Sequence, residues 1–327
     1  MLRLRIQFYR DRVIVLKLID LHCDTISCCM KEKDKYGLFR NDFNVDIEKL
    51  KKANSSAQFF AMFVDLEKTK DPLEACLLMA DKFHQELEIN KNYIKLAKNY
   101  EDIISNEKED KISAFLTIEE GGVLQGSIGN LKRFYEMGVR LITLTWNYPN
   151  DLGFPNANIK DWKQGLTSFG KEVVQEMNSL GMLVDVSHLS DEGFYQVADI
   201  SSRPFVASHS NARAVTHNYR NLTDDMIKLL AEKGGVMGIN FEKSFLGNRQ
   251  FSAVEDMVTH IKHIFKVGGA EVLAMGSDFD GINQELEIRD IGEIDKLINV
   301  LIKEGFTEGQ LEKFLYKNAL RVIKDVL

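Results

Sequence analysis

Residues 17–26 read KLIDLHCDTI and place two side chains that bind metals, His22 and Asp24, at the end of an apolar run. Residues i and i+2 of a β-strand point to the same face, so the imidazole and the carboxylate lie together if this run is a strand. A lone His-x-Asp is a weak pattern, because an aspartate and a threonine after a strand also serve as ordinary turn residues. The other strand ends must decide between a turn and a metal site.

Eight apolar runs recur along the chain, at residues 15–22, 57–65, 112–120, 139–146, 181–188, 203–209, 234–241 and 271–278. Near-continuous apolar runs are typical of strands that are buried on both faces, as in parallel sheets. Amphipathic segments with helical spacing lie between them, for example at 168–181, 222–235 and 252–269. We therefore predict an α/β fold, a (β/α)8 TIM barrel closed by a C-terminal helical tail, and keep a doubly wound open sheet as the alternative.

The bulk properties indicate one domain that acts on a small molecule. The chain has 327 residues, 44% of them hydrophobic, and no Gly/Ser/Pro-rich linker, so we predict a single barrel domain over 1–327. Residues 1–16 are expected to be an N-terminal extension, in which the alternation of LRLRIQF suits an added strand. A formal charge of −7 without a long Lys/Arg run argues against nucleic acid and anionic membranes as partners. No apolar stretch is long enough to span a bilayer, and the first residues do not fit a secretory signal.

The four cysteines, Cys23, Cys28, Cys29 and Cys76, show no disulfide framework and no Cys-x-x-Cys pair. This spacing favours reduced thiols and a cytoplasmic location. Cys23 lies between His22 and Asp24, so on a strand it faces away from them and is expected to pack as a small apolar residue.

Five of the eight runs end in side chains that can bind metals or transfer protons. These are His22 and Asp24, Glu119 and Glu120 before a Gly-Gly pair, His188, His209, and Asp278 and Asp280. In a TIM barrel these ends meet at the carboxyl-terminal face, where the active sites of the fold lie. Imidazole and carboxylate together suit Zn²⁺ and similar metals rather than Ca²⁺ or Mg²⁺. The set is too large for one tetrahedral site, so it predicts two ions that share a bridging carboxylate and hold a bridging hydroxide.

The motifs DLHCDT, IEEGG, DVSH, FVASHSNARAV with YRN, and GSDFDG resemble the membrane (renal) dipeptidase family of zinc peptidases. The resemblance runs from about residue 19 to NALRV near the C-terminus, and it is that of a cytoplasmic, microbial-type member. It implies a TIM barrel, two Zn²⁺ ions per chain, and hydrolysis of dipeptides that often carry a D-residue at the C-terminal position. Mn²⁺ and Co²⁺ remain open as alternative ions.

The resemblance also implies roles for individual residues. The metal ligands would be His22, Asp24, Glu120, His188 and His209. Glu120 is expected to bridge the ions and so take part in catalysis; neighbouring strand residues face opposite ways, and the Gly-Gly context favours it over Glu119. Asp278 would bind substrate and act as the catalytic acid/base, with Asp280 as the alternative. Arg220 would bind the substrate carboxylate through its planar guanidinium.

One position departs from the family pattern. Members close to the mammalian enzyme carry a histidine after the TLT of the fourth strand, where it contacts the substrate and the developing oxyanion. In this chain Trp146 follows Thr145, and Asn147 is the residue that we expect to contact the substrate in its place. His260 and His263 lie at i, i+3 of a helix and are expected on a solvated face rather than in a metal site.

Three functions stay open at this point. The leading one is a binuclear zinc dipeptidase whose partner is a small dipeptide, and a homodimer is an open possibility. The second is a related metal-dependent amidohydrolase that acts on N-acyl amino acids, lactams or lactones. The third is a metal-binding or assembly protein without catalysis, which an intact ligand set disfavours.

Overall fold

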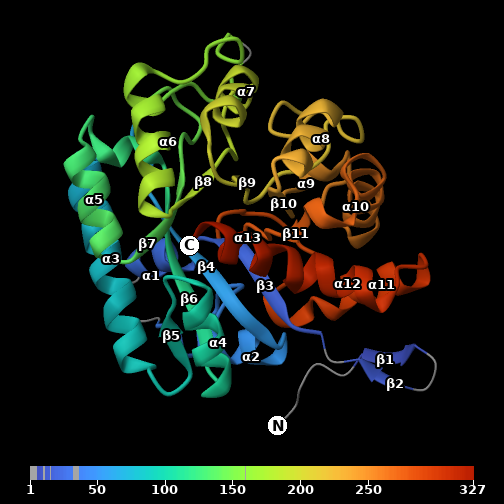
Figure 1. Ribbon diagram of the computed structural model, residues 1–327. Coiled ribbons are helices and arrows are strands. Elements are labelled where there is room, and N and C mark those ends of the chain that lie inside the picture. The colour runs from blue at the N-terminus through green and yellow to red at the C-terminus, as the bar shows by residue number, and fades with distance from the viewer. Residues whose placement is uncertain (1–5, 10–11, 15, 32–36, 159) are drawn as a thin grey trace.

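The computed structural model describes residues 6–9, 12–14, 16–31, 37–158 and 160–327 (Figure 1). Its main sheet contains eight parallel strands that follow the eight predicted runs: β3 (Leu18–Cys23), β4 (Ser55–Phe63), β6 (Ile112–Glu119), β7 (Val139–Thr143), β8 (Leu183–Asp185), β9 (Val206–Ala207), β10 (Val236–Ile239) and β11 (Leu273–Met275). Pairing of β11 with β3 and of β4 with β6 closes the sheet into a barrel. The TIM barrel is therefore confirmed, and the open sheet is wrong.

A further strand, β5 (Ile94–Leu96), was not expected from the sequence. It pairs with residues 112–114 at the start of β6, while β7 pairs with residues 116–119 at its end. β5 therefore extends one side of the sheet without entering the closed barrel.

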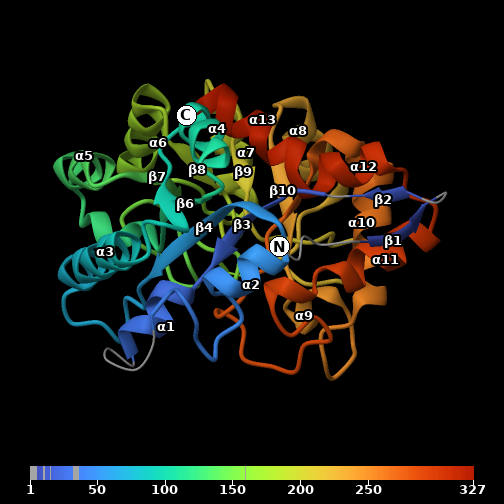
Figure 2. The ribbon, with the colours of Figure 1, turned by 90° about the horizontal axis from the view of Figure 1, so that it is seen from below.

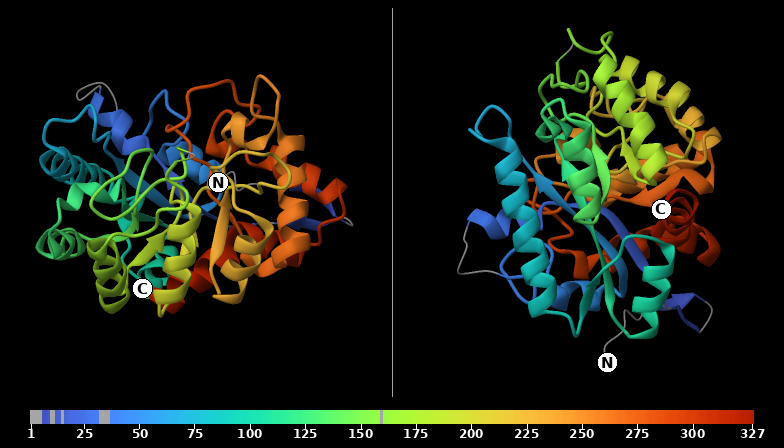
Figure 3. Two further views of the ribbon diagram at one scale, coloured as in Figure 1. Left: turned by 90° about the horizontal axis from the view of Figure 1, so that it is seen from above. Right: turned by 60° about the vertical axis from the view of Figure 1, so that its left-hand side comes forward.

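Helices surround the strands (Figures 1 and 3). They are α1 (Thr25–Lys31), α2 (Ile47–Lys52), α3 (Pro72–Ile89), α4 (Tyr100–Lys108), α5 (Ile128–Glu136), α6 (Ser168–Leu180), α7 (Asp191–Ile200), α8 (Asp224–Glu232), α9 (Lys243–Leu246), α10 (Val254–Gly268), α11 (Asp295–Lys303), α12 (Glu308–Glu312) and α13 (Asn318–Val326). The predicted helix at 168–181 is α6, which Thr167 caps by accepting from the Gly170 amide and which ends at Gly181 with φ 71°. Within the part of the chain that is described, no helix has the length and apolarity needed to cross a membrane.

The C-terminal helix closes one end of the barrel. One buried apolar cluster takes side chains from all eight barrel strands and from α13, namely Ile19, Phe59, Phe115, Leu141, Leu183, Val206, Val236, Ala274, Val322 and Ile323. Several of these residues start their strands, so α13 covers the amino-terminal end of the barrel. The carboxyl-terminal end is left for the polar side chains that follow the strands.

Residues 6–9 and 12–14 form strands that lie outside the barrel. β1 (Ile6–Tyr9) and β2 (Arg12–Ile14) pair antiparallel in a two-stranded sheet of their own, beside α11 (Figure 2). A strand therefore occurs in the alternating stretch, as β1, but it belongs to this separate sheet; residues 2–5 of the stretch lie outside the described residues.

Candidate active site

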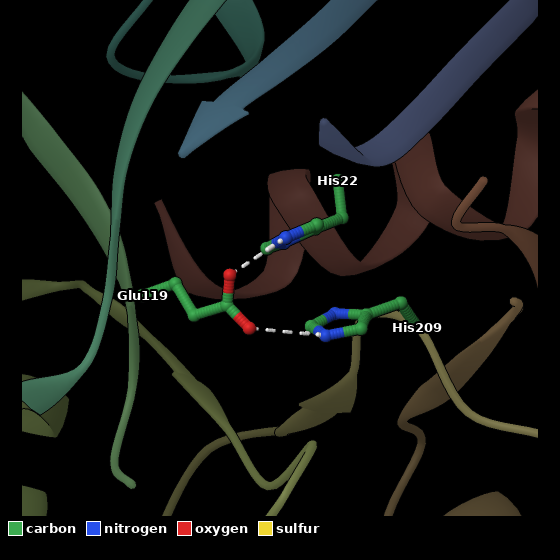
Figure 4. Close-up of side chains that lie close together, drawn as sticks. All are labelled: His22, Glu119 and His209. Carbon is green, nitrogen blue, oxygen red and sulfur yellow. Dashed lines mark ion pairs between the residues drawn. The ribbon is translucent and has the colours of Figure 1, made fainter. Parts of the chain in front are cut away.

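The carboxyl ends of the strands bring three histidines around one carboxylate. Glu119, the last residue of β6, lies between His22 of β3 and His209, which follows β9 (Figure 4). One carboxylate oxygen, Oε2, lies 3.2 Å from Nε2 of His22. The other, Oε1, lies 3.0 Å from Nε2 of His188 and 3.4 Å from Nε2 of His209. Each oxygen of Glu119 thus faces a different set of nitrogen atoms.

Two aspartates complete the His22 side of this cluster. Nε2 of His22 lies 3.4 Å from Oδ2 of Asp24 and 3.7 Å from Oδ1 of Asp278. The Oδ1 atom of Asp24 and both ring nitrogens of His22 are buried without a hydrogen-bond partner among the described residues. Buried polar atoms without partners are costly, so their concentration here points to a ligand that would satisfy them.

Backbone strain concentrates at the same place. Four non-glycine residues at or beside the cluster have positive φ, namely Glu120 (103°), His188 (67°), Asp278 (62°) and Asp280 (69°). Non-glycine residues in this region are strained, and such strain gathers at functional sites. It lets the chain turn sharply as it leaves the strands while these side chains stay fixed.

The structure corrects the choice between the two glutamates. Glu120 turns away from the histidines: its carboxylate accepts from the backbone amides of Gly122 at 2.7 Å and Trp146 at 3.0 Å, and from the Asn150 side chain. Burial raises the pKa of this carboxyl to about 7. Strand alternation does separate the pair, but Glu119 is the member that faces the histidines, so we replace Glu120 by Glu119 in the candidate ligand set.

The Gly-Gly pair that favoured Glu120 has a packing role instead. A Cβ on Gly121 would lie 2.8 Å from the Leu144 carbonyl oxygen, and a Cβ on Gly122 would lie 2.9 Å from Oε1 of Glu120. The glycines therefore allow the turn after β6 to pack closely, and Glu120 caps that turn.

The electrostatics suit a cation. Burial, followed by the charge of Arg220, lowers the pKa of His188 to about 4, and burial with the neighbouring charge of His22 lowers the pKa of His209, so both rings are neutral and can act as ligands. Burial and the charge of Glu119 raise the pKa of Asp24 to about 6, and burial raises the pKa of Asp278 to about 8. Crowded buried carboxylates of this kind are relieved when a divalent ion binds between them.

Arg220 supplies a buried cation close to the cluster. Its Nη1 donates to Ser210 Oγ at 2.8 Å, while Nε and Nη2 have no partner within the described residues. The guanidinium also lies over the Phe245 ring, 5.6 Å from its centroid. Burial lowers the pKa of Arg220 to about 10, which still leaves it charged at neutral pH. Two free donors on a buried guanidinium are suited to a planar carboxylate.

The remaining predicted residues fall in different places. Oδ1 of Asn147 lies 3.1 Å from Nδ1 of His188, so this side chain contacts a candidate ligand. Trp146 packs against the rings of Phe63 and Tyr148. Asp280 accepts from Thr25 Oγ1 at 2.5 Å and from the Asn44 amide at 2.6 Å, so it joins its own loop to the start of α1 and to the loop before α2.

Of the two helical histidines, His260 is not on the solvated face that we expected, whereas His263 keeps a quarter of its side chain exposed. His260 is fully buried: Nδ1 accepts from the Ala212 amide at 3.1 Å, and Nε2 lies 2.9 Å from the Leu246 carbonyl oxygen. His263 lies 2.7 Å from Oδ1 of Asp224. His260 therefore joins α10 to the Ala212 loop and to the end of α9, and His263 joins α10 to α8. Neither histidine belongs to the candidate metal site.

Comparison with known proteins gives a family model and relatives that match most of the chain. The family model described as membrane dipeptidase (peptidase family M19) matches residues 9–327. An uncharacterised protein of Klebsiella pneumoniae is 37% identical over 67% of this chain and 84% of its own length. An uncharacterised dipeptidase of Schizosaccharomyces pombe is 30% identical over 94% of this chain and 80% of its own length.

Solved structures share the fold. A metallo peptidase from Rhodobacter sphaeroides, crystallised with a phosphinate mimic of the dipeptide L-Ala-D-Ala, superposes with a TM-score of 0.87 at 24% identity, covering 95% of this chain and 99% of its own. A probable dipeptidase from Pseudomonas aeruginosa superposes with a TM-score of 0.84 at 19% identity, covering 95% of both chains. With the family model matched over almost the whole sequence, the chain belongs to the membrane dipeptidase family.

Proposed function

We propose that this protein is a binuclear metallo-dipeptidase, with zinc as the resident ion. His22, Asp24 and Glu119 would hold one ion, and Glu119, His188 and His209 the other. The observation that carries the proposal is the split of the Glu119 carboxylate, whose Oε2 faces His22 and whose Oε1 faces His188 and His209. A carboxylate in this position can bridge two ions.

The ligand atoms present fit such an ion. Two nitrogen ligands of one tetrahedral zinc ion, each at about 2.0–2.1 Å, lie roughly 3.3 Å apart. The Nε2 atoms of His188 and His209 lie 3.1 Å apart. The donor set of imidazole and carboxylate is also that of zinc rather than of calcium or magnesium.

The site would act on a peptide bond next to a free carboxylate. When bound, the two ions would supply a Lewis acid for the peptide carbonyl and a water of lowered pKa. Arg220 would bind the substrate carboxylate with Nε and Nη2, its two unpaired donors. Asn240 Nδ2 donates to Oδ2 of Asp278 at 2.9 Å and fixes this carboxyl beside the cluster. The other oxygen of Asp278 would take a proton and pass it to the departing amine.

The preferred substrate that we propose is a dipeptide with a C-terminal D-residue. Support comes from the Rhodobacter sphaeroides peptidase, whose bound phosphinate mimics L-Ala-D-Ala. Arg220 does not distinguish a dipeptide from an N-acyl amino acid, because both offer one carboxylate, so the substrate class must be tested directly.

A substrate panel with matched pairs tests this function. The purified zinc protein should hydrolyse L-Ala-D-Ala faster than L-Ala-L-Ala, and both much faster than their C-terminal amides. N-acetyl-D-alanine should be a poor substrate. Faster hydrolysis of N-acetyl-D-alanine would favour the amidohydrolase alternative, and zinc binding without turnover of any compound would refute catalysis.

A further inference from the structure

Two of the candidate ligands have a partner on the ring nitrogen that faces away from Glu119. Nδ1 of His209 lies 2.7 Å from Ser208 Oγ, and Nδ1 of His188 lies 3.1 Å from Asn147 Oδ1. In each ring Nε2 is the atom directed at Glu119. A neutral imidazole binds a metal only through the nitrogen that carries no proton, so the partner on Nδ1 decides which ring nitrogen is available.

The direction of the bond to His209 follows from Asp185. This buried carboxylate accepts from Thr143 Oγ1 at 2.7 Å and from the amides of Ser187 and Ser208, both at 2.9 Å. It also accepts from Ser208 Oγ at 2.5 Å. All four of these neighbours donate to the carboxylate oxygens, so the hydroxyl proton of Ser208 lies toward Asp185.

Ser208 Oγ can then only accept from His209. The proton between them belongs to Nδ1 of His209, and Nε2 keeps its lone pair toward Glu119. Thr143, at the end of β7, and Ser187, just after β8, both donate to Asp185. Two neighbouring barrel strands therefore fix Asp185, and through Ser208 they orient the His209 ring. The arrangement at His188 is parallel: the amide oxygen of Asn147 accepts from Nδ1 and leaves Nε2 free.

We infer that Asn147, and Asp185 acting through Ser208, are positioning residues that hold His188 and His209 in the tautomer whose Nε2 points at Glu119. This role rests on the metal-dependent function proposed above and adds residues that do not touch the ion. Outer partners of this kind raise ligand basicity and orient the ring, and their loss typically lowers metal affinity about 10–100-fold. It also revises the expected role of Asn147 from substrate contact to ligand support.

The direct test reads the tautomers without any metal or turnover. In the metal-free protein labelled with ¹⁵N-histidine, His188 and His209 should both carry the proton on Nδ1. Asn147→Leu should change the signal of His188 and leave His209 unchanged, whereas Ser208→Ala should do the reverse, so each variant is the control for the other. If His188 and His209 of the parent protein carry the proton on Nε2, the inference is overturned. This measurement needs no variant, so it holds even if Ser208→Ala does not fold.

Zinc affinity gives the second readout. In competition with a chromophoric chelator, Asn147→Leu and Ser208→Ala should each weaken zinc binding about 10–100-fold. Asn147→Asp keeps an acceptor and should restore the affinity. Thr145→Val is a matched control, since Thr145 Oγ1 is buried without a partner in the described structure. Parent-like affinity in Asn147→Leu would contradict the role. If tautomers and affinities behave as expected but no dipeptide is hydrolysed, the proposed function fails and this inference stands.

Discussion

Gly281 leaves room for the aspartates of the candidate metal centre. A Cβ at this position would lie 2.2 Å from Oδ2 of Asp24 and 2.7 Å from Oδ1 of Asp278. In Gly281→Ala the Asp24 carboxylate must withdraw by about 1.2 Å to regain an ordinary contact of 3.4 Å. A displacement of about 1 Å at a reacting centre can cost on the order of 100-fold in rate.

We therefore expect Gly281→Ala to fold, to hold less than the parent's metal content, and to lose on the order of 100-fold in kcat/KM, or about 2.7 kcal/mol of transition-state stabilisation. Gly309→Ala is the matched control, because a Cβ there meets nothing within 4 Å. Both variants should be assayed with L-Ala-D-Ala and by elemental analysis. Parent-like activity and metal content in Gly281→Ala would refute the placement of Asp24 and Asp278 at the centre.

Three further predictions follow from the same structure. Arg220→Ala should lower kcat/KM for dipeptide acids by about 2–4 kcal/mol, as expected when a buried charge pair loses one partner, yet barely change the slow hydrolysis of the amides; equal losses on both would refute carboxylate binding. Asp278→Asn should keep about two ions but lose roughly 10²–10⁴ in kcat, and loss of an ion would instead make Asp278 a ligand. Burial lowers the pKa of His260 to about 4, so the stability that its neutral ring contributes is present above about pH 6.5 and is lost as the pH falls toward 4. The difference in unfolding free energy between the parent and His260→Gln in urea should therefore narrow by up to about 3 kcal/mol from pH 7.5 to pH 4.5, and a constant difference would contradict a neutral ring.

The barrel could be predicted because its strands are buried on both faces. All eight apolar runs became barrel strands, since continuous apolar runs bounded by turn residues leave few other interpretations. β5 was missed because three residues, Ile94–Leu96, are too short to show a pattern. The helical tail was expected to close the barrel, and α13 does so through Val322 and Ile323.

At the end of β6 the sequence did not decide which of two adjacent glutamates faces the candidate site. The alternation of side chains along a strand implies that Glu119 and Glu120 face opposite ways, but it does not indicate which of them faces the carboxyl-terminal end of the barrel. That depends on where β6 ends, and on the amides of Gly122 and Trp146 that hold Glu120.

Tertiary contacts likewise decided two other positions. His260 is polar on a helix, yet α10 packs it beneath the Ala212 loop, where both ring nitrogens find backbone partners. The contact of Asn147 with His188 joins residues 41 apart in the sequence, and no local pattern marks it.

The bridging role of Glu119 is the central claim, and the metal content of two neighbouring variants tests it most directly. Glu119→Gln and Glu120→Gln each replace a carboxyl by an amide of the same shape, at adjacent positions, in glutamates that are both buried. Elemental analysis after gel filtration should find about two zinc ions per chain in the parent and in Glu120→Gln, and clearly fewer than two in Glu119→Gln. Loss of zinc in Glu120→Gln, with two ions retained in Glu119→Gln, would contradict the account.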